Sequence, residues 1–190
     1  MLVGSSLMPG LLHCLGLIFF MSEITNSIRS IVLNDVEQRI VKHIAQRKRQ
    51  YYEGHNIGPI LSTPSTKDRL RHYIEAWGAE YAFCILHNVY PPTDIIDFDD
   101  YDVSVPGIGT VDIKSTERMD GRLIINLKKA KSRANVFALM CGSFPSYIFG
   151  GWLWAKDAIK RRNLTDLGYG KCYAIEQERL NRNLAICVTR

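Results

Sequence analysis

The segment from Tyr101 to Thr116 constrains the fold most, because its side chains alternate between apolar and polar over two stretches with a turn between them. Valine or isoleucine stands at every second position of both stretches, namely Val103, Val105, Val111 and Ile113. Pro106-Gly107-Ile108-Gly109 between them is rich in the residues that tight turns require. Successive side chains of a strand point to opposite faces of a sheet. The pattern therefore predicts an antiparallel hairpin with one apolar face and one polar face.

The polar face of this hairpin gathers charged groups. If Val105 faces Val111 across the turn, Asp102 lies opposite Lys114 and Ser104 lies opposite Asp112. Asp102, Asp112 and Lys114 then project from the same face. An exposed cross-strand ion pair between Asp102 and Lys114, worth less than ~1 kcal/mol, is the structural alternative. The functional interpretation is an active site built from two carboxylates and one amine.

A helix is expected before this hairpin, starting at Ser65 or Thr66 and running to about Asn88. Pro91-Pro92 follows it and cannot continue a helix. Its inner face is predicted to consist of Leu70, Ile74, Trp77, Tyr81, Cys84 and Ile85.

Glu80 lies beside this apolar face, three residues after Trp77 and four before Cys84. A carboxylate is costly there unless something compensates its charge. A divalent cation shared with the hairpin carboxylates would do so. A side chain that reaches solvent, or an ion pair with Arg71 or Arg118, is the alternative.

Oxygen ligands of this kind suit Mg²⁺, with Mn²⁺ as a substitute. Asp102, Asp112, Glu80 and the backbone carbonyl of Ile113 are the candidate ligands. A bound cation would activate water and relieve charge on a phosphodiester, while Lys114 positions or deprotonates the water or steadies the phosphate oxygens. The sequence therefore predicts phosphodiester hydrolysis with Glu80, Asp102, Asp112 and Lys114 as catalytic residues.

These residues carry a family resemblance. Glu80, then Asp102, then Asp112-Ile113-Lys114 resemble the PD-(D/E)XK nuclease superfamily, most clearly over Trp77 to Thr116. The resemblance extends more loosely through Asn135 to Trp154 and on to Asp166-Gly170, an arrangement similar to small nucleases encoded by bacteriophages. It implies a restriction-endonuclease-like fold and Mg²⁺-dependent hydrolysis of DNA rather than RNA. It also implies that Asp102 and Asp112 are metal ligands.

The first carboxylate of the motif has rivals. Tyr101 rather than proline precedes Asp102, and Pro92-Thr93-Asp94 is closer to the dipeptide of the family name. Asp102 is preferred because it alone shares a hairpin face with Asp112. The alternatives are Asp94, Asp97, Asp99 and Asp100.

The rest of the chain predicts further helices and strands around this hairpin. Apolar residues at every fourth position from Ile24 to Ile44 predict an amphipathic helix that ends near Gln50, and a loop follows to residue 65. Strands are expected at 122–127, 135–141, 146–154 and 184–188, and a helix at 156–162. The predicted fold is α+β, with a central mixed β-sheet flanked by helices: a restriction-endonuclease-like core with an N-terminal helical arm. The expected division is 1–20, 21–64 (helix and loop) and 65–190 (nuclease-like domain).

The chain carries a net charge of +5 over 190 residues, with an isoelectric point near 9.0, which fits a polyanion-binding protein. DNA is the expected partner, and Arg47-Lys48-Arg49 is an alternative contact surface. A homodimer or a place in a larger assembly stays open. So does a non-catalytic nucleic-acid-binding module on the same fold. The residues expected to bind DNA are Arg118, Arg122, Lys128, Lys129, Lys131 and Arg133.

Residues 1–20 contain no Asp, Glu, Lys or Arg. Three interpretations stay open: translation that begins at Met21, a disordered tail, or a membrane anchor. Glycines and a proline interrupt the segment, so a membrane role is not expected. The five cysteines have no zinc-ligand or redox spacing, which predicts free thiols and a cytoplasmic protein.

Overall fold

The computed structural model describes residues 30–55, 66–95, 101–168 and 170–183. In chain order the strands and helices are β1 (Ser30–Val32), α2 (Asp35–Gly54), α3 (Thr66–Leu86), β2 (Val103–Val105), β3 (Gly109–Thr116), β4 (Leu123–Asn126), β5 (Val136–Ser143), β6 (Ser146–Trp154), α4 (Ala155–Ala158), β7 (Leu164–Asp166) and β8 (Lys171–Ile175). Three short 3₁₀ turns accompany them: η1 (Lys129–Lys131), η2 (Arg161–Asn163) and η3 (Gln177–Arg179).

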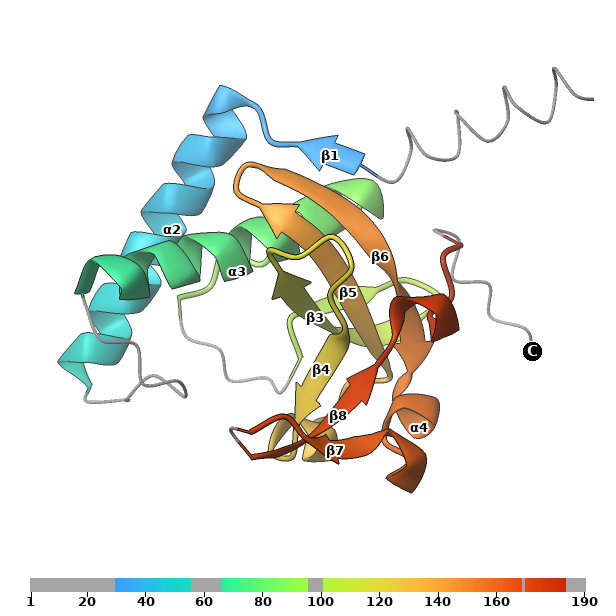
Figure 1. Ribbon diagram of the computed structural model, residues 1–190. Coiled ribbons are helices and arrows are strands. Elements are labelled where there is room, and N and C mark those ends of the chain that lie inside the picture. Colours follow the sequence, from blue (N-terminus) through green and yellow to red (C-terminus); the bar gives the residue numbers. More distant parts are fainter. Residues whose placement is uncertain (1–29, 56–65, 96–100, 169, 184–190) are drawn as a thin grey trace, which may run out of the picture.

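Two sheets organise these elements (Figure 1). The larger has the strand order β1-β6-β5-β3-β2, in which β3 and β5 are parallel and all other neighbours are antiparallel. The smaller is antiparallel, in the order β4-β8-β7. The predicted α+β class, with a mixed sheet flanked by helices, is confirmed. A restriction-endonuclease-like core stays a prediction.

Strand β5 is buried on both of its faces, and its alternating side chains enter two different cores. Val136, Ala138 and Met140 belong to the core that includes α3. Phe137, Leu139 and Cys141 belong to the core that includes β4 and β8. A strand covered on both sides reads as a continuous apolar run, as this one does.

The neighbouring strand β3 also lies between the two cores that cover β5. Val111 and Ile113 pack on the α3 side. Asp112 and Lys114 therefore point to the other side, where Phe137 and Leu139 are their partners across the parallel register. The predicted separation of apolar and charged residues on β3 is confirmed.

The hairpin register differs from the predicted one by two residues. Val103 faces Val111 and Val105 faces Gly109, because the chain turns back directly after Val105, where Ile108 N donates to Val105 O (3.0 Å). Continuing this register places Asp102 opposite Asp112 rather than opposite Lys114. A shift of two residues preserves the face of each side chain, so Asp102 still shares a face with Asp112.

The first helix starts later than predicted. The Asn34 side chain accepts hydrogen bonds from the backbone of Val36 and Glu37, and the Glu37 carboxylate accepts one from Asn34 N, so a capping box fixes the start at Asp35. Ser30–Val32 instead extends the large sheet beside β6. The predicted apolar stripe, which Ile31 and Val41 widen, is only partly a buried face. Val41 is fully buried and Ile31 and Ile44 pack against the core, whereas Val32, Val36 and Ile40 are exposed.

Helix α3 is confirmed within two residues of its predicted end. Trp77 and Cys84 are buried as expected, and so are Ala79, Ala82 and Phe83. The wider burial follows from its position, since α2 packs against it on one side and β3, β5 and β6 on another. Cys84, Cys141 and Cys172 are free thiols, as predicted.

Near the carboxyl terminus, the helix expected over 156–162 is only the four-residue α4 followed by η2. The Asp166–Gly170 segment joins β7 to β8, a hairpin that the sequence did not predict. The strand expected at 184–188 and the apolar segment 1–20 lie outside the described residues. Among the residues that are described, no helix is long and apolar enough to cross a membrane.

Gly78 offers a test of the packing between α3 and the large sheet. An added Cβ would collide with Tyr147 Oη and come within 3.0 Å of Phe144. Gly78→Ala should therefore lower the free energy of unfolding by about 1–2 kcal/mol, although alanine is the better helix former. Gly54→Ala is the matched control, because no atom lies within 4 Å of its added Cβ. Urea denaturation followed by circular dichroism measures both, and equal stability of the two variants would contradict the packing described.

Candidate active site

The centre of the site is the carboxylate of Asp112, which is 0% exposed. Lys114 Nζ contacts its Oδ1, and Lys129 Nζ lies 3.1 Å from its Oδ2. A buried carboxylate is strongly destabilising when it lacks partners. The two ammonium groups compensate that cost, and both lysines remain partly open to solvent, at 24% and 31% side-chain exposure.

Asp102 is tied to the same strand by its side chain. Strand β2 pairs with β3 only over Gly109–Val111, so Ile113 N–H lies beyond the end of the pairing. Asp102 Oδ2 accepts that hydrogen bond at 2.5 Å, and Asp102 N donates to Val111 O at 3.0 Å. The Asp102 carboxylate therefore accepts from Ile113 the hydrogen bond that a further paired residue of a longer β2 would accept. The alternative of an Asp102–Lys114 ion pair is not what forms, since Lys114 contacts Asp112.

The Asp112 carboxylate lies close enough to oppose the ionisation of Asp102. Burial, and next the charge of Asp112, raise the pKa of Asp102 to about 6. The charges of Lys114 and Lys129 and the Ile113 hydrogen bond act in the opposite direction without cancelling the effect. The surroundings of Asp102 therefore disfavour its ionised form.

Glu80 approaches this cluster from α3 and is partly buried. Burial, together with the charges of Glu80 and Asp102, raises the pKa of Cys84 to about 12. Glu80 also acts on the pKa of Lys129. The charge of Glu80 thus acts on the pKa of both Cys84 and Lys129.

Arg71 and Arg118, the predicted alternative partners of Glu80, form ion pairs with other carboxylates. Arg71 pairs with Glu117 at 2.9 Å and lies 3.9 Å from Glu75. Arg118 pairs with Asp120 at 2.9 Å.

Lys129 was expected among the residues that bind DNA. In the structure its ammonium group contacts the buried carboxylate of Asp112 instead. Its backbone N–H donates to Asn126 Oδ1 (2.8 Å), and its carbonyl accepts from Ser132 N (3.0 Å), which anchors η1 to the end of β4. The sequence contains no signal for this placement, because the basic run from Lys128 to Arg133 gives its lysines no distinguishing pattern.

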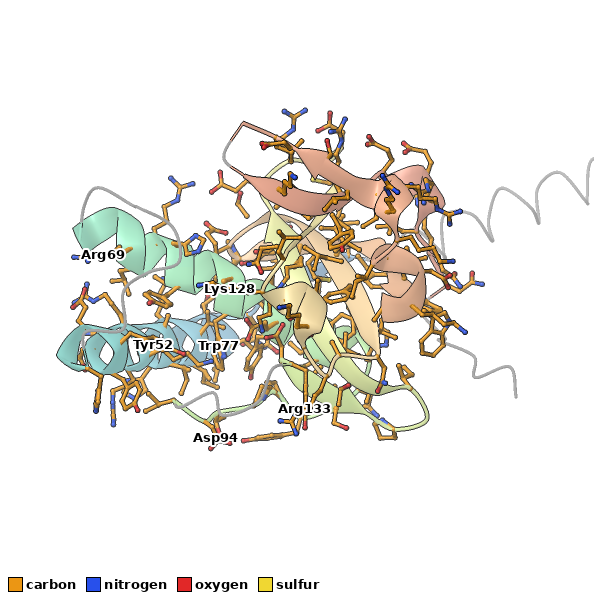
Figure 2. The ribbon with its side chains drawn as sticks, turned by 90° about the horizontal axis from the view of Figure 1, so that it is seen from below. Tyr52, Arg69, Trp77, Asp94, Lys128 and Arg133 are labelled. Carbon is orange, nitrogen blue, oxygen red and sulfur yellow. The ribbon has the colours of Figure 1, made fainter. Side chains whose placement is uncertain are left out.

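The other residues expected to bind DNA are all exposed. Arg118 and Arg122 form ion pairs, the latter with Glu176 at 2.8 Å. Lys128, Lys131 and Arg133 lie on the segment that leads from β4 to β5; Figure 2 shows Lys128, just before the η1 turn, and Arg133 further along.

Of the alternative sites, Lys48 within Arg47–Arg49 is buried and Arg49 lies 3.7 Å from Glu53. The rival Asp94 is exposed, at the periphery of the molecule in Figure 2. Asp97, Asp99 and Asp100 lie outside the described residues.

A hollow of about 550 Å³ opens beside Lys114. Ser115 and Thr116 line it, together with the ion pairs Arg118–Asp120 and Arg122–Glu176. Lys114 is therefore shared between the buried carboxylate and an open surface large enough to admit a ligand.

The described residues contain no group of three or more His, Cys, Asp or Glu side chains already arranged around a metal position. The oxygen donors that a hard divalent cation prefers are nevertheless present, since Asp112 on β3 and Asp102 just before β2 both carry carboxylates, and two ammonium groups already lie against Asp112. Neither a family model, nor a curated protein, nor a solved structure matches this chain.

The crowding of Asp102 and Asp112 can be measured. The native pKa of Asp102 lies above its unfolded value, so the ionised form costs stability, and that cost grows as the pH rises from about 4 to about 6. Asp102→Asn keeps an acceptor for Ile113 N–H and removes the charge. In EDTA it should stabilise the protein by up to about 3 kcal/mol at pH 7.5 and by little at pH 4.5. Asp94→Asn, at an exposed position, should have no effect at either pH. A loss of stability at pH 7.5 for Asp102→Asn, measured by denaturant titration, would contradict this reading.

Proposed function

We propose that this chain is a divalent-metal-dependent nuclease that hydrolyses phosphodiester bonds of DNA. The observation that carries the proposal is the fully buried Asp112 carboxylate, which contacts two lysines and has Asp102 beside it; one of those lysines, Lys114, also borders an open hollow. A purely structural ion pair does not need a second buried carboxylate next to the first. A cation site uses two or more carboxylates together.

Asp102 and Asp112 would hold the metal, with Glu80 and the Ile113 carbonyl as further ligands. A Mg²⁺ held there, or Mn²⁺ in its place, would lower the pKa of a coordinated water and neutralise charge on the phosphate. Asp102 is positioned for this by its bond to Ile113 N, which keeps its carboxylate on the edge of β3.

Lys114 is the proposed group that meets the substrate. The pairing of β3 with β5 fixes its backbone, with Lys114 beside Leu139, while its side chain borders the hollow. An ammonium in that position can steady a phosphate oxygen or orient the attacking water. It reaches the substrate without leaving the neighbourhood of Asp112.

The DNA would approach from the side of the hollow and η1. Ser115 and Thr116 offer hydroxyl groups there, and Lys128, Lys131 and Arg133 offer exposed positive charge nearby. Phosphate contacts of this kind supply most of the sequence-independent affinity for DNA. A cytoplasmic location forms part of the proposal, supported by the three buried free cysteines.

A non-catalytic DNA-binding module is the second candidate. It is favoured by the same two lysines, because they already neutralise Asp112 and give a stable site without metal. Metal-dependent cleavage distinguishes the two proposals.

The nuclease proposal predicts that purified protein cuts plasmid or single-stranded DNA in Mg²⁺ or Mn²⁺ and not in EDTA. Asp112→Asn should lose cleavage by several orders of magnitude, because it removes the charge that holds the cation. Lys114→Met should lose cleavage while metal binding persists, since it removes no ligand. Lys156→Met, an exposed lysine on α4, is the matched control and should cut normally. Circular dichroism checks the fold of each variant. DNA binding without cleavage in any divalent metal would favour the binding module instead.

The position of the DNA is tested by charge reversal on η1. The double variant Lys128→Glu/Lys131→Glu should weaken DNA binding by about tenfold or more and reduce the slope of log Kd against log salt by roughly two. Lys42→Glu/Lys156→Glu changes the net charge equally at exposed positions elsewhere and should have a much smaller effect. Fluorescence anisotropy across a salt series measures both. Equal losses in the two variants would place the DNA on another surface, with Arg47–Arg49 as the next candidate.

A further inference from the structure

One ammonium group contacts the buried carboxylate of the site and is acted on by the charges of the other two carboxylates. Lys129 Nζ lies 3.1 Å from Oδ2 of the buried Asp112. Burial alone would lower the pKa of Lys129, but the charges of Asp112, Asp102 and Glu80 outweigh it and raise the pKa. These three carboxylates come from β3, from the residue before β2 and from α3. The same three groups form the proposed metal site.

The two lysines of the site are held differently. Lys114 belongs to β3 itself, and its neighbour Leu139 on β5 fixes its place along the strand. Lys129 comes from a short turn whose backbone is anchored by Asn126 and Ser132, while its flexible side chain stays 31% exposed. Lys129 can therefore move its ammonium toward solvent without disturbing a strand.

We propose that Lys129 is an internal counter-cation that occupies the metal position in the metal-free protein and leaves it when a divalent ion binds. This inference rests on the proposed function, because it concerns the ligands of the same site. A metal ion and the ammonium group cannot both lie against Asp112 Oδ2 while sharing Asp102 and Glu80. The lysine thus stabilises the empty site and lowers its affinity for metal.

The proposal is tested by removing the charge of Lys129. Lys129→Gln keeps a hydrogen-bond donor for Asp112 and lacks the charge, and Lys129→Met removes both. In calorimetric titrations with Mn²⁺ alone, each should bind the metal about tenfold more tightly than the wild type, or better. Lys131→Met is the control, because it removes an exposed charge from the same turn. It should change the affinity less than about threefold.

Thermal unfolding gives a second measurement that does not depend on activity. In EDTA, Lys129→Met should melt at a lower temperature than the wild type, because buried Asp112 has lost a partner. Saturating Mn²⁺ should raise the melting temperature of this variant more than that of the wild type. Lys129→Gln extends the comparison should Lys129→Met fail to fold without metal.

The outcomes separate this inference from the proposed function. Wild-type protein that binds Mn²⁺, with unchanged or weaker binding in the folded Lys129→Gln variant, overturns the role of Lys129 and leaves the nuclease proposal standing. Absence of Mn²⁺ binding in the wild type and in both variants overturns the two together. Cleavage that persists in Lys129→Gln alongside tighter metal binding supports both.

Discussion

The contact of two lysine ammonium groups with the buried Asp112 carboxylate is the interaction on which the rest of the site depends. Without them, a carboxylate with no exposed surface beside Phe137 would oppose folding. With them, β3 can carry a charged residue through a layer that is otherwise apolar. The same contact links the η1 turn to β3, although fifteen residues separate Lys114 from Lys129 in the sequence.

The double-sided burial of β5 explains why the charged face of β3 is interior rather than exposed. Phe137 and Leu139 lie in the core that includes β4 and β8, so their parallel neighbours Asp112 and Lys114 point into the same layer. The other side of β3 packs on α3 through Val111 and Ile113. The short β2 leaves the far end of this edge open, and Asp102 caps it at Ile113 N. A cluster with a buried carboxylate and two partly exposed lysines is thus formed between the two cores.

Much of this could be predicted from local pattern, and what failed depends on long-range contacts. Period-two alternation predicted the hairpin and the faces of Asp102, Asp112 and Lys114, because side-chain direction in a strand follows from sequence position alone. The register failed because it depends on where the turn closes, and two turn positions satisfy the same alternation. The predicted start of α2 was wrong because it followed the four-residue spacing of Val32, Val36 and Ile40. The capping box of Asn34 and Glu37 instead sets the start of the helix. The role of Lys129 depends on a contact across seventeen residues, for which a run of lysines has no signature.

The free-energy cost of burying these charged groups bears on the function of the site. Replacing a buried ionic cluster by apolar side chains of similar volume is often neutral or stabilising, so ion pairs alone are a poor reason to keep Asp112 and its lysines inside a core. Asp102 adds to that cost, since its pKa of about 6 records a carboxylate that burial and Asp112 both disfavour. A fold selected only for stability would place an apolar or amide side chain at one of these positions. An excess of carboxylate oxygen, held at a strand edge and balanced by a lysine with a path to solvent, is what a site that exchanges one cation for another requires.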